Sequence, residues 1–269
     1  MTEQEYNQHD GVRRSDLWKI RESPEKYLWA IEHPEEPTPA LIFGAMVHKM
    51  LLEPLSFANE YAVAPNVDRR TKAGKEAWQA FTEQNSGKVI ISADDFDQAN
   101  AMVNHVMSHP IAQKLLGGRA ELPLFWTDED TTELCKVRLD MLTELNGQPV
   151  VVDYKTATSA MTDKFNESIF KYGYALQAFM YTEAVMKNMC LTERPRFIFI
   201  VQEKKPPYSV NVVEVTEDVM TNGMDTFREL IGVLHQCKET GYFYSFNGPF
   251  DEINETYLPG WLSMGDEDE

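Results

Sequence analysis

The dipeptide Asn146-Gly147 constrains the fold of this chain more than any other feature, because it separates two runs that alternate between apolar and polar residues. Both residues tolerate the positive φ of a type I′ turn, so the pattern predicts a tight antiparallel hairpin between strands at 133–145 and 149–154. Counting outward from the turn places Asp140 opposite Asp153. One face is then expected to hold Val137, Leu139, Met141, Val150 and Val152, and the other Lys136, Arg138, Asp140, Asp153 and Lys155.

The opposed acids of this hairpin have a chemical explanation. Carboxylates directly across a strand pair have Cβ atoms roughly 5 Å apart and repel each other. A hard cation such as Mg²⁺ removes the conflict, because it takes oxygen ligands while keeping several waters. Lys155 lies on the same face as Asp153, where it can activate the attacking water or neutralise charge on a phosphate. The alternative is structural: Asp153 pairs with Lys155, and Asp140 pairs with Arg138 or Lys136.

A histidine on an earlier helix is a further candidate ligand. The segment 40–53 is predicted to be helical, and His48 lies one turn after Gly44, which leaves room beside it. Helical spacing puts His48 on one stripe with Leu41, Ala45 and Leu52, so we expect its imidazole to point inward. It is either a hydrogen-bonded core residue or a ligand of the proposed metal. Glu53 lies off this stripe and is expected to be structural.

The helix predicted after the hairpin, at 169–189, carries a polar stripe. Tyr174, Gln177 and Tyr181 are spaced three and four residues apart and therefore line one face. Amide and phenol groups arranged in this way can hold a phosphodiester and its terminal base beside the metal. The alternative is an amphipathic helix whose tyrosines cap the core.

The spacing of apolar residues and the helix-capping residues along the rest of the chain predict an α/β (α+β mixed) fold. We expect one domain at 1–262, with a mainly helical part at 1–118 that carries His48, a sheet core at 119–262 that carries the active site, and an acidic tail at 263–269. Short helices are predicted to begin near Ser15 and Ser23. Longer helices are predicted at 71–85, 92–116 and 217–241, and further strands at 121–126, 196–201 and 209–215.

Composition excludes several classes of protein. The net charge of −18 repels polyanions, so any contact with nucleic acid must be local. Basic residues do cluster locally, at Arg13-Arg14, at Arg69-Arg70 with Lys72 and Lys75, and at Lys204-Lys205. Three separated cysteines indicate neither a zinc site nor a disulfide framework. The N-terminus lacks a leader and no apolar run is long enough for a bilayer, so we expect a soluble, cytoplasmic protein with no membrane partner.

The candidate residues occur in a recognisable order: His48 on a helix, Asp140, Asp153-Tyr154-Lys155, and Gln177 four residues before Tyr181. This order resembles the PD-(D/E)xK nuclease superfamily and, more narrowly, its RecB-like branch. A closer resemblance is to the RecE-type, exonuclease VIII group of phage recombination exonucleases. It is carried by Ser23-Pro24 with Tyr27, and by the segments 43–48, 51–54, 121–128, 135–138 and 258–261.

The resemblance implies a restriction-endonuclease-like core, a central mixed sheet flanked by helices. It also implies Mg²⁺-dependent hydrolysis of one DNA strand from a duplex end, with Mn²⁺ as a substitute, by a ring-shaped homo-oligomer that works with a single-strand annealing protein. The implied metal ligands are His48, Asp140, Asp153 and the Tyr154 carbonyl. Lys155 would activate the water, while the implied substrate contacts are Gln177, Tyr181, Tyr174 and Arg138.

The chain departs from the family pattern at two positions of the hairpin. Asp153 stands where Glu is commoner, and Leu139 stands where many relatives have Pro or Gly. Neither change removes a functional group. Two other functions remain open: a structure-specific endonuclease on the same core, and a non-catalytic, DNA-mimicking regulator. The retained Asp140, Asp153 and Lys155 argue against the regulator.

Overall fold

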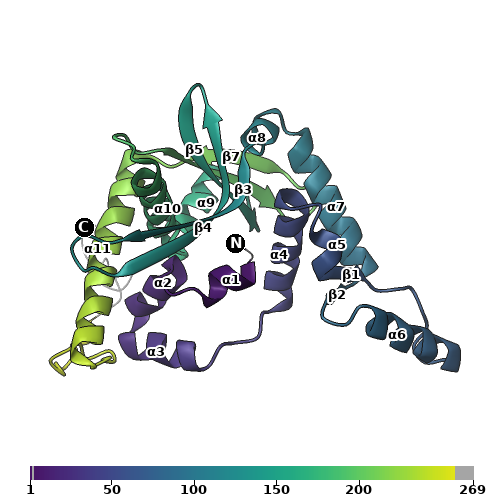
Figure 1. The fold of residues 1–269 in the computed structure, drawn as a ribbon, viewed down its shortest axis with the longest axis horizontal. Coiled ribbons are helices and arrows are strands. Elements are labelled where there is room, and N and C mark those ends of the chain that lie inside the picture. Colours follow the sequence, from purple (N-terminus) through teal and green to yellow (C-terminus); the bar gives the residue numbers. More distant parts are fainter. Residues whose placement is uncertain (2, 258–269) are drawn as a thin grey trace, which may run out of the picture.

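The central element of the fold is a five-stranded mixed sheet, seen in a computed structural model that describes Met1 and residues 3–257 (Figure 1). The strand order is β3-β4-β5-β6-β7, and only β5 and β6 run parallel to each other. This sheet confirms the predicted mixed α/β class. The strands span β3 Arg119–Thr127, β4 Leu134–Leu145, β5 Gln148–Ala157, β6 Arg196–Glu203 and β7 Val210–Glu214.

The hairpin of β4 and β5 has the predicted turn and register. Asn146 and Gly147 have φ values of 54° and 80°, as a type I′ turn requires. The ladder runs from Leu145↔Gln148 to Met141↔Val152, so Asp140 and Asp153 are the next positions in register.

The prediction that Val137, Leu139 and Met141 share a face is wrong. Val137 and Leu139 pack in one core cluster, whereas Met141 packs in the other cluster with Val150 and Val152. The reason lies in β3, where Glu121 has a φ of 50° and interrupts the pairing with β4 between two regular pairs. Such irregularities bend a strand and re-aim its side chains. Asp140 therefore lies at the point where the apolar side chains of β4 switch from one face of the sheet to the other.

Helices cover both faces of the sheet, each over its own apolar cluster (Figure 1). One cluster includes Phe179, Phe199 and Phe227, and the other includes Met46 and Met102. The first is covered by α2 Arg14–Glu22, α3 Pro24–Glu32, α9 Thr162–Lys171, α10 Tyr174–Met189 and α11 Glu217–Thr240. The second is covered by α4 Pro39–Leu52, α7 Ala93–Ser108 and α8 Pro110–Leu115.

Two segments that were each predicted as one helix are pairs of helices. The segment 169–189 is broken before α10, where Gly173 adopts a left-handed φ of 68°. The segment 92–116 is broken at Pro110, which has no N–H to continue α7, and His109 caps the new helix through an Nδ1 that accepts the Ala112 N–H at 3.2 Å.

A projecting arm carries most of the elements that were not predicted (Figure 1). It comprises α5 Phe57–Glu60, β1 Tyr61–Val63, α6 Lys72–Gln84 and β2 Val89–Ile91, of which only α6 was expected. The strands β1 and β2 form a small parallel sheet, and α1 Glu3–Gln8 was also not predicted. The acidic tail and the segment 258–261 lie outside the described residues. Within residues 3–257, no helix is both long and apolar enough to cross a bilayer.

A pair of glycines on α11 tests how tightly this helix packs on α10. A Cβ added to Gly223 would lie 2.2 Å from the Ala175 carbonyl oxygen, whereas one added to Gly232 would meet nothing within 4 Å. We expect Gly223→Ala to lower the free energy of unfolding by about 1–3 kcal/mol. Gly232→Ala should raise it by up to about 1 kcal/mol, because Ala is the better helix former. Urea unfolding of both variants measures the difference, and equal effects would refute the close contact.

Candidate active site

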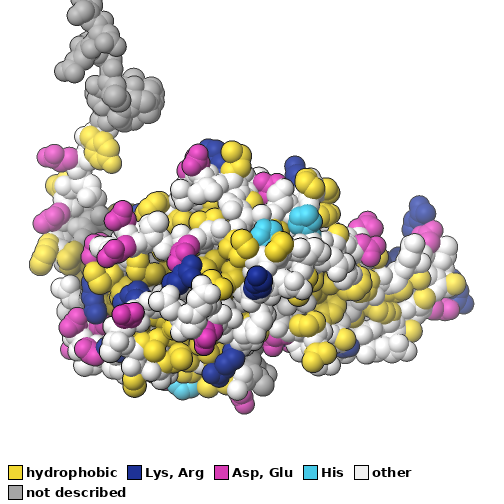
Figure 2. Space-filling view, turned by 90° about the horizontal axis from the view of Figure 1, so that it is seen from above, with side chains coloured by type: hydrophobic (Ala, Val, Ile, Leu, Met, Phe, Trp, Pro, Cys, Tyr) yellow, Lys and Arg dark blue, Asp and Glu magenta, His cyan; other side chains and the backbone are white. Residues whose placement is uncertain are grey.

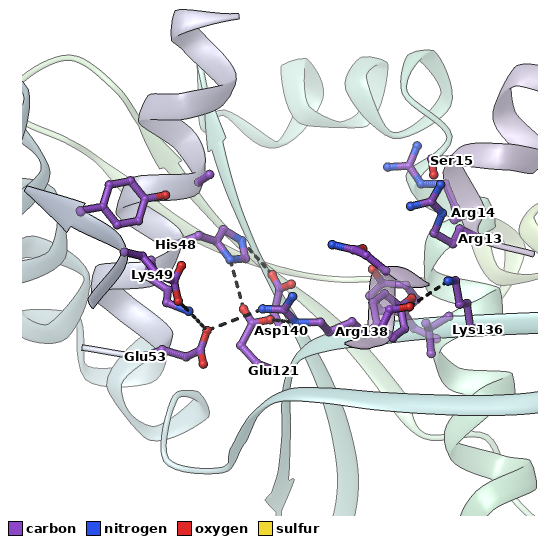
Figure 3. A pocket seen from close by; sticks show the side chains of 17 residues that line it. Arg13, Arg14, Ser15, His48, Lys49, Glu53, Glu121, Lys136, Arg138 and Asp140 are labelled. Carbon is purple, nitrogen blue, oxygen red and sulfur yellow. Dashed lines mark hydrogen bonds and ion pairs between the residues drawn. The ribbon is translucent and has the colours of Figure 1, made fainter. Parts of the chain in front are cut away.

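A histidine and two acids from three elements meet in one cavity of about 460 Å³ (Figure 3). His48 comes from α4, Glu121 from β3 and Asp140 from β4. The His48 Nε2 lies 3.0 Å from the Asp140 Oδ2, and its Nδ1 lies 3.8 Å from the Glu121 Oε1. One ligand atom from each residue lies within 4.8 Å of the others. One imidazole nitrogen and two carboxylates form a donor set that fits a divalent metal ion.

The backbone of β5 joins this group through Tyr154. The Tyr154 carbonyl oxygen lies 3.0 Å from the His48 Nε2, and its N–H donates to the Asp140 Oδ2 at 2.8 Å. The carbonyl that the resemblance implied as a ligand therefore lies against His48, and the N–H of the same residue contacts Asp140. The hydrogen bond also fixes the orientation of the Asp140 carboxylate.

Asp153 is fully buried next to this group, and each of its oxygens has a neighbour. Its Oδ1 accepts a hydrogen bond from the Gln177 Nε2 at 2.5 Å, and its Oδ2 lies 2.5 Å from the Lys155 Nζ. The ion pair of the structural alternative is thus present for Asp153, but Asp140 pairs with His48 instead of Arg138 or Lys136. Gln177 contacts the acid of the site directly.

The pKa values of the two aspartates shift in opposite directions: Asp153 is fully buried, and Asp140 is partly buried. Burial and the charge of Asp140 raise the pKa of Asp153 to about 6, against the opposing effect of Lys155. Burial would also raise the pKa of Asp140, but the charge and hydrogen bond of His48 lower it below its ordinary value. Burial lowers the pKa of His48, and the charge of Asp140 outweighs this and raises it to about 10. Asp140 is therefore held in its ionised form by the charge of His48, whereas Asp153 ionises less readily than an ordinary aspartate.

The other cations of the cavity are engaged by protein groups. Arg138 pairs with Glu121 through its Nε and lies 3.6 Å from Glu53. Lys136 was predicted on the reactive face, but it is buried and its ammonium donates to the carbonyls of Tyr6 and His9. Its charge therefore holds the N-terminal segment in place.

The tyrosines of α10 line two different cavities. Tyr181 borders the cavity of Figure 3, together with Arg13 and Arg14. Tyr174 borders a second cavity, and the Lys155 ammonium lies 5.0 Å from its ring centroid. The predicted polar stripe of α10 thus runs along both cavities, with Gln177 between them at Asp153.

Glu121 was not predicted as a site residue. Glu53, which was expected to be structural, lies in the same cavity and forms ion pairs with Lys49 and Arg138. In the sequence, Glu121 is the acid directly before the apolar run of β3 and the first residue of the family-like segment 121–128. Of the predicted basic clusters, Arg13-Arg14 lines the first cavity and Lys204 lines the second. Arg69-Arg70, Lys72 and Lys75 lie on or just before α6 of the arm. Figure 2 shows basic and acidic side chains interspersed on one face of the molecule.

Comparisons with known proteins identify the family and the fold of the chain. The family model described as "PDDEXK-like domain of unknown function (DUF3799)" matches residues 14–244. A crystal structure of a provisionally described exonuclease from Eubacterium rectale has a TM-score of 0.62 at 13% identity, and 99% of each chain is covered. The structure of SSO0001 has a TM-score of 0.36 at 13% identity and covers 84% of this chain and 81% of its own. No curated protein matches the sequence. The chain belongs to the PDDEXK-like DUF3799 family.

Proposed function

We propose that this protein is a Mg²⁺-dependent exodeoxyribonuclease of the RecE type. It degrades one strand of linear double-stranded DNA from its end, in the 5′-to-3′ direction, and leaves 3′ single-stranded overhangs for recombination. The observation that carries the proposal is the cluster of His48, Glu121 and Asp140 next to the buried pair of Asp153 and Lys155. Family membership supports the nuclease chemistry, and the resemblance of the sequence motifs supports the exonuclease type.

In this proposal each side chain has a defined task. His48, Glu121, Asp140 and Asp153, with the Tyr154 carbonyl, would hold the divalent ion. The ion supplies Lewis-acid polarisation of the scissile phosphate. Lys155 orients the attacking water and neutralises charge that develops on the phosphate. Tyr181, Tyr174, Gln177 and Arg138 hold the substrate strand.

The proposed partners follow from the same activity. A resecting exonuclease produces single strands, so a single-strand annealing protein is the expected partner, and a ring-shaped homo-oligomer would keep the enzyme on its duplex. The net charge of −18 would then repel DNA from the outer surface and leave binding to a few local cations. We place this activity in the cytoplasm of a bacterial or phage-infected cell.

The test compares linear duplex, labelled at either 5′ end or either 3′ end, with covalently closed circular DNA. Both are incubated with Mg²⁺, Mn²⁺ or excess EDTA. We expect loss of the linear duplex in either metal, release of the 5′ label first, an intact circle and no reaction in EDTA. Cleavage of the circle would support the endonuclease alternative. Binding of partners without any cleavage would support the DNA-mimicking regulator.

A further inference from the structure

A second cavity of about 860 Å³ begins at the site and leads away from Glu121 and Asp140. It shares Ala45 and His48 with the cavity of Figure 3, so the two cavities meet at one turn of α4. Its walls come from α4, from the end of β5 and the loop after it, from α9, and from the start of α10. A molecule bound in it would therefore have one end at the site.

The wall of this cavity is polar and more basic than the protein as a whole. Among the described residues it carries Lys155, Lys164 and Lys204 but a single acid, Glu167, which lies 2.6 Å from the Lys164 Nζ. Lys204 has no carboxylate within ion-pair distance in the described part of the chain. The end of β5 adds a hydroxyl group at Thr156, and the loop after β5 adds those of Thr158 and Ser159. These are the donors that bind phosphate oxygens in nucleic-acid complexes.

Two tyrosine rings extend from the site along this cavity. The Tyr174 ring lies 5.0 Å from the Lys155 ammonium, and the Tyr172 ring follows at 5.8 Å from the Tyr174 ring, measured between centroids. Tyr172 is 46% exposed, and the Lys171 ammonium lies 5.3 Å from its ring centroid. Its backbone is held in place, because its carbonyl accepts a hydrogen bond from Arg14 at 3.1 Å. Aromatic side chains along a positively charged groove are the usual platform on which unpaired bases stack.

We propose that this cavity, lined by Tyr172, Tyr174 and Lys204, binds a short single-stranded segment of the substrate polynucleotide next to the cleavage site. The inference rests on the proposed function and adds the state of the substrate, an unpaired strand. A cavity of this size accommodates roughly two or three nucleotides, since pockets of about 300–1,000 Å³ hold small ligands. In a duplex the bases are already stacked and paired, so the tyrosine rings select strands that have separated.

The test measures the binding of a fluorescent 12-residue oligothymidylate by anisotropy in EDTA, where no hydrolysis occurs. We expect Tyr172→Ala to weaken binding about 5- to 150-fold, because stacking on an aromatic side chain contributes about 1–3 kcal/mol per base. Tyr172→Phe keeps the ring and should bind like the wild type. Lys204→Gln should weaken binding several-fold and reduce the salt slope by about 0.7. Its neighbour Lys205 lies outside the cavity, so Lys205→Gln is the matched control.

The outcomes separate this inference from the proposed function. Three results would overturn the proposal that the cavity binds a strand, whether or not the enzyme cleaves DNA. They are unchanged binding in both Tyr172→Ala and Lys204→Gln, an equal loss of binding in Lys205→Gln, and no binding by the wild type. Loss of binding in Tyr172→Ala and Lys204→Gln would support it, even if linear duplex proved not to be a substrate. Thermal unfolding of each variant confirms that the fold is intact.

Discussion

Asp140→Asn should abolish cleavage of linear duplex, with a fall in rate of about 10³-fold or more. The substitution removes the carboxylate that lies 3.0 Å from His48 and thereby one of the three side-chain donors for the ion. The amide oxygen can still accept the Tyr154 N–H that Asp140 accepts at 2.8 Å, so the fold should be retained. Single-turnover digestion at saturating Mg²⁺, with a circular dichroism spectrum of each protein, measures both effects.

The matched control for this variant is Glu53→Gln. Glu53 lines the same cavity but contacts Lys49 and Arg138 and stands outside the three-residue cluster. We expect the Glu53→Gln variant to cleave linear duplex at a rate within about 10-fold of the wild-type rate. Comparable rates for Asp140→Asn and wild type would show that the carboxylate is not needed for the reaction.

Asp153→Asn is expected to remove cleavage and to make the stability of the metal-free protein less dependent on pH. The pKa of Asp153 is raised from its ordinary value of 3.8 to about 6, so the folded state holds its proton more tightly than the unfolded state. Between these values stability falls as pH rises, because ionisation is costlier in the folded protein. Asparagine cannot ionise, so the free energy of unfolding of the variant relative to the wild type should rise by about 2 kcal/mol from pH 4 to pH 7. Loss of the ion pair with Lys155 adds an offset that does not follow this titration.

Urea unfolding in EDTA across that pH range checks this expectation, with Asp163→Asn as the control. Asp163 is an exposed acid in the first turn of α9, and its variant should follow the wild type at every pH. A constant difference in stability between Asp153→Asn and wild type across the range would contradict the raised pKa. Full cleavage by the variant would remove Asp153 from the site.

The hairpin could be predicted from the sequence because everything that determines it is local. The Asn146-Gly147 turn fixes the register, and the register alone brings Asp140 next to Asp153. The helix that carries His48 could be predicted for the same reason, since its periodic pattern ends at Pro54. Leu41, which was expected on the inward stripe, is 64% exposed, because α4 buries Met46, Val47 and Lys49 instead.

The parts of the site that depend on distant contacts could not be predicted in this way. Glu121 itself has a left-handed φ at the point where β3 pairs with β4, and this conformation brings it into the cluster. No local sequence pattern signals that conformation. The hydrogen bond of Gln177 to Asp153 depends on how α10 crosses the sheet. The small parallel sheet of the arm joins strands about thirty residues apart, each only three residues long, too short for a clear period.

Titration of the metal-free protein with Mn²⁺, followed by electron paramagnetic resonance, tests the central claim most directly. The claim is that His48, Glu121 and Asp140 together hold a divalent ion. We predict saturable binding of Mn²⁺ by the wild type and by Glu53→Gln, competition by Mg²⁺, and loss of this binding in Glu121→Gln and Asp140→Asn. Absence of Mn²⁺ binding in the wild type, or equal affinity in Asp140→Asn, would contradict it.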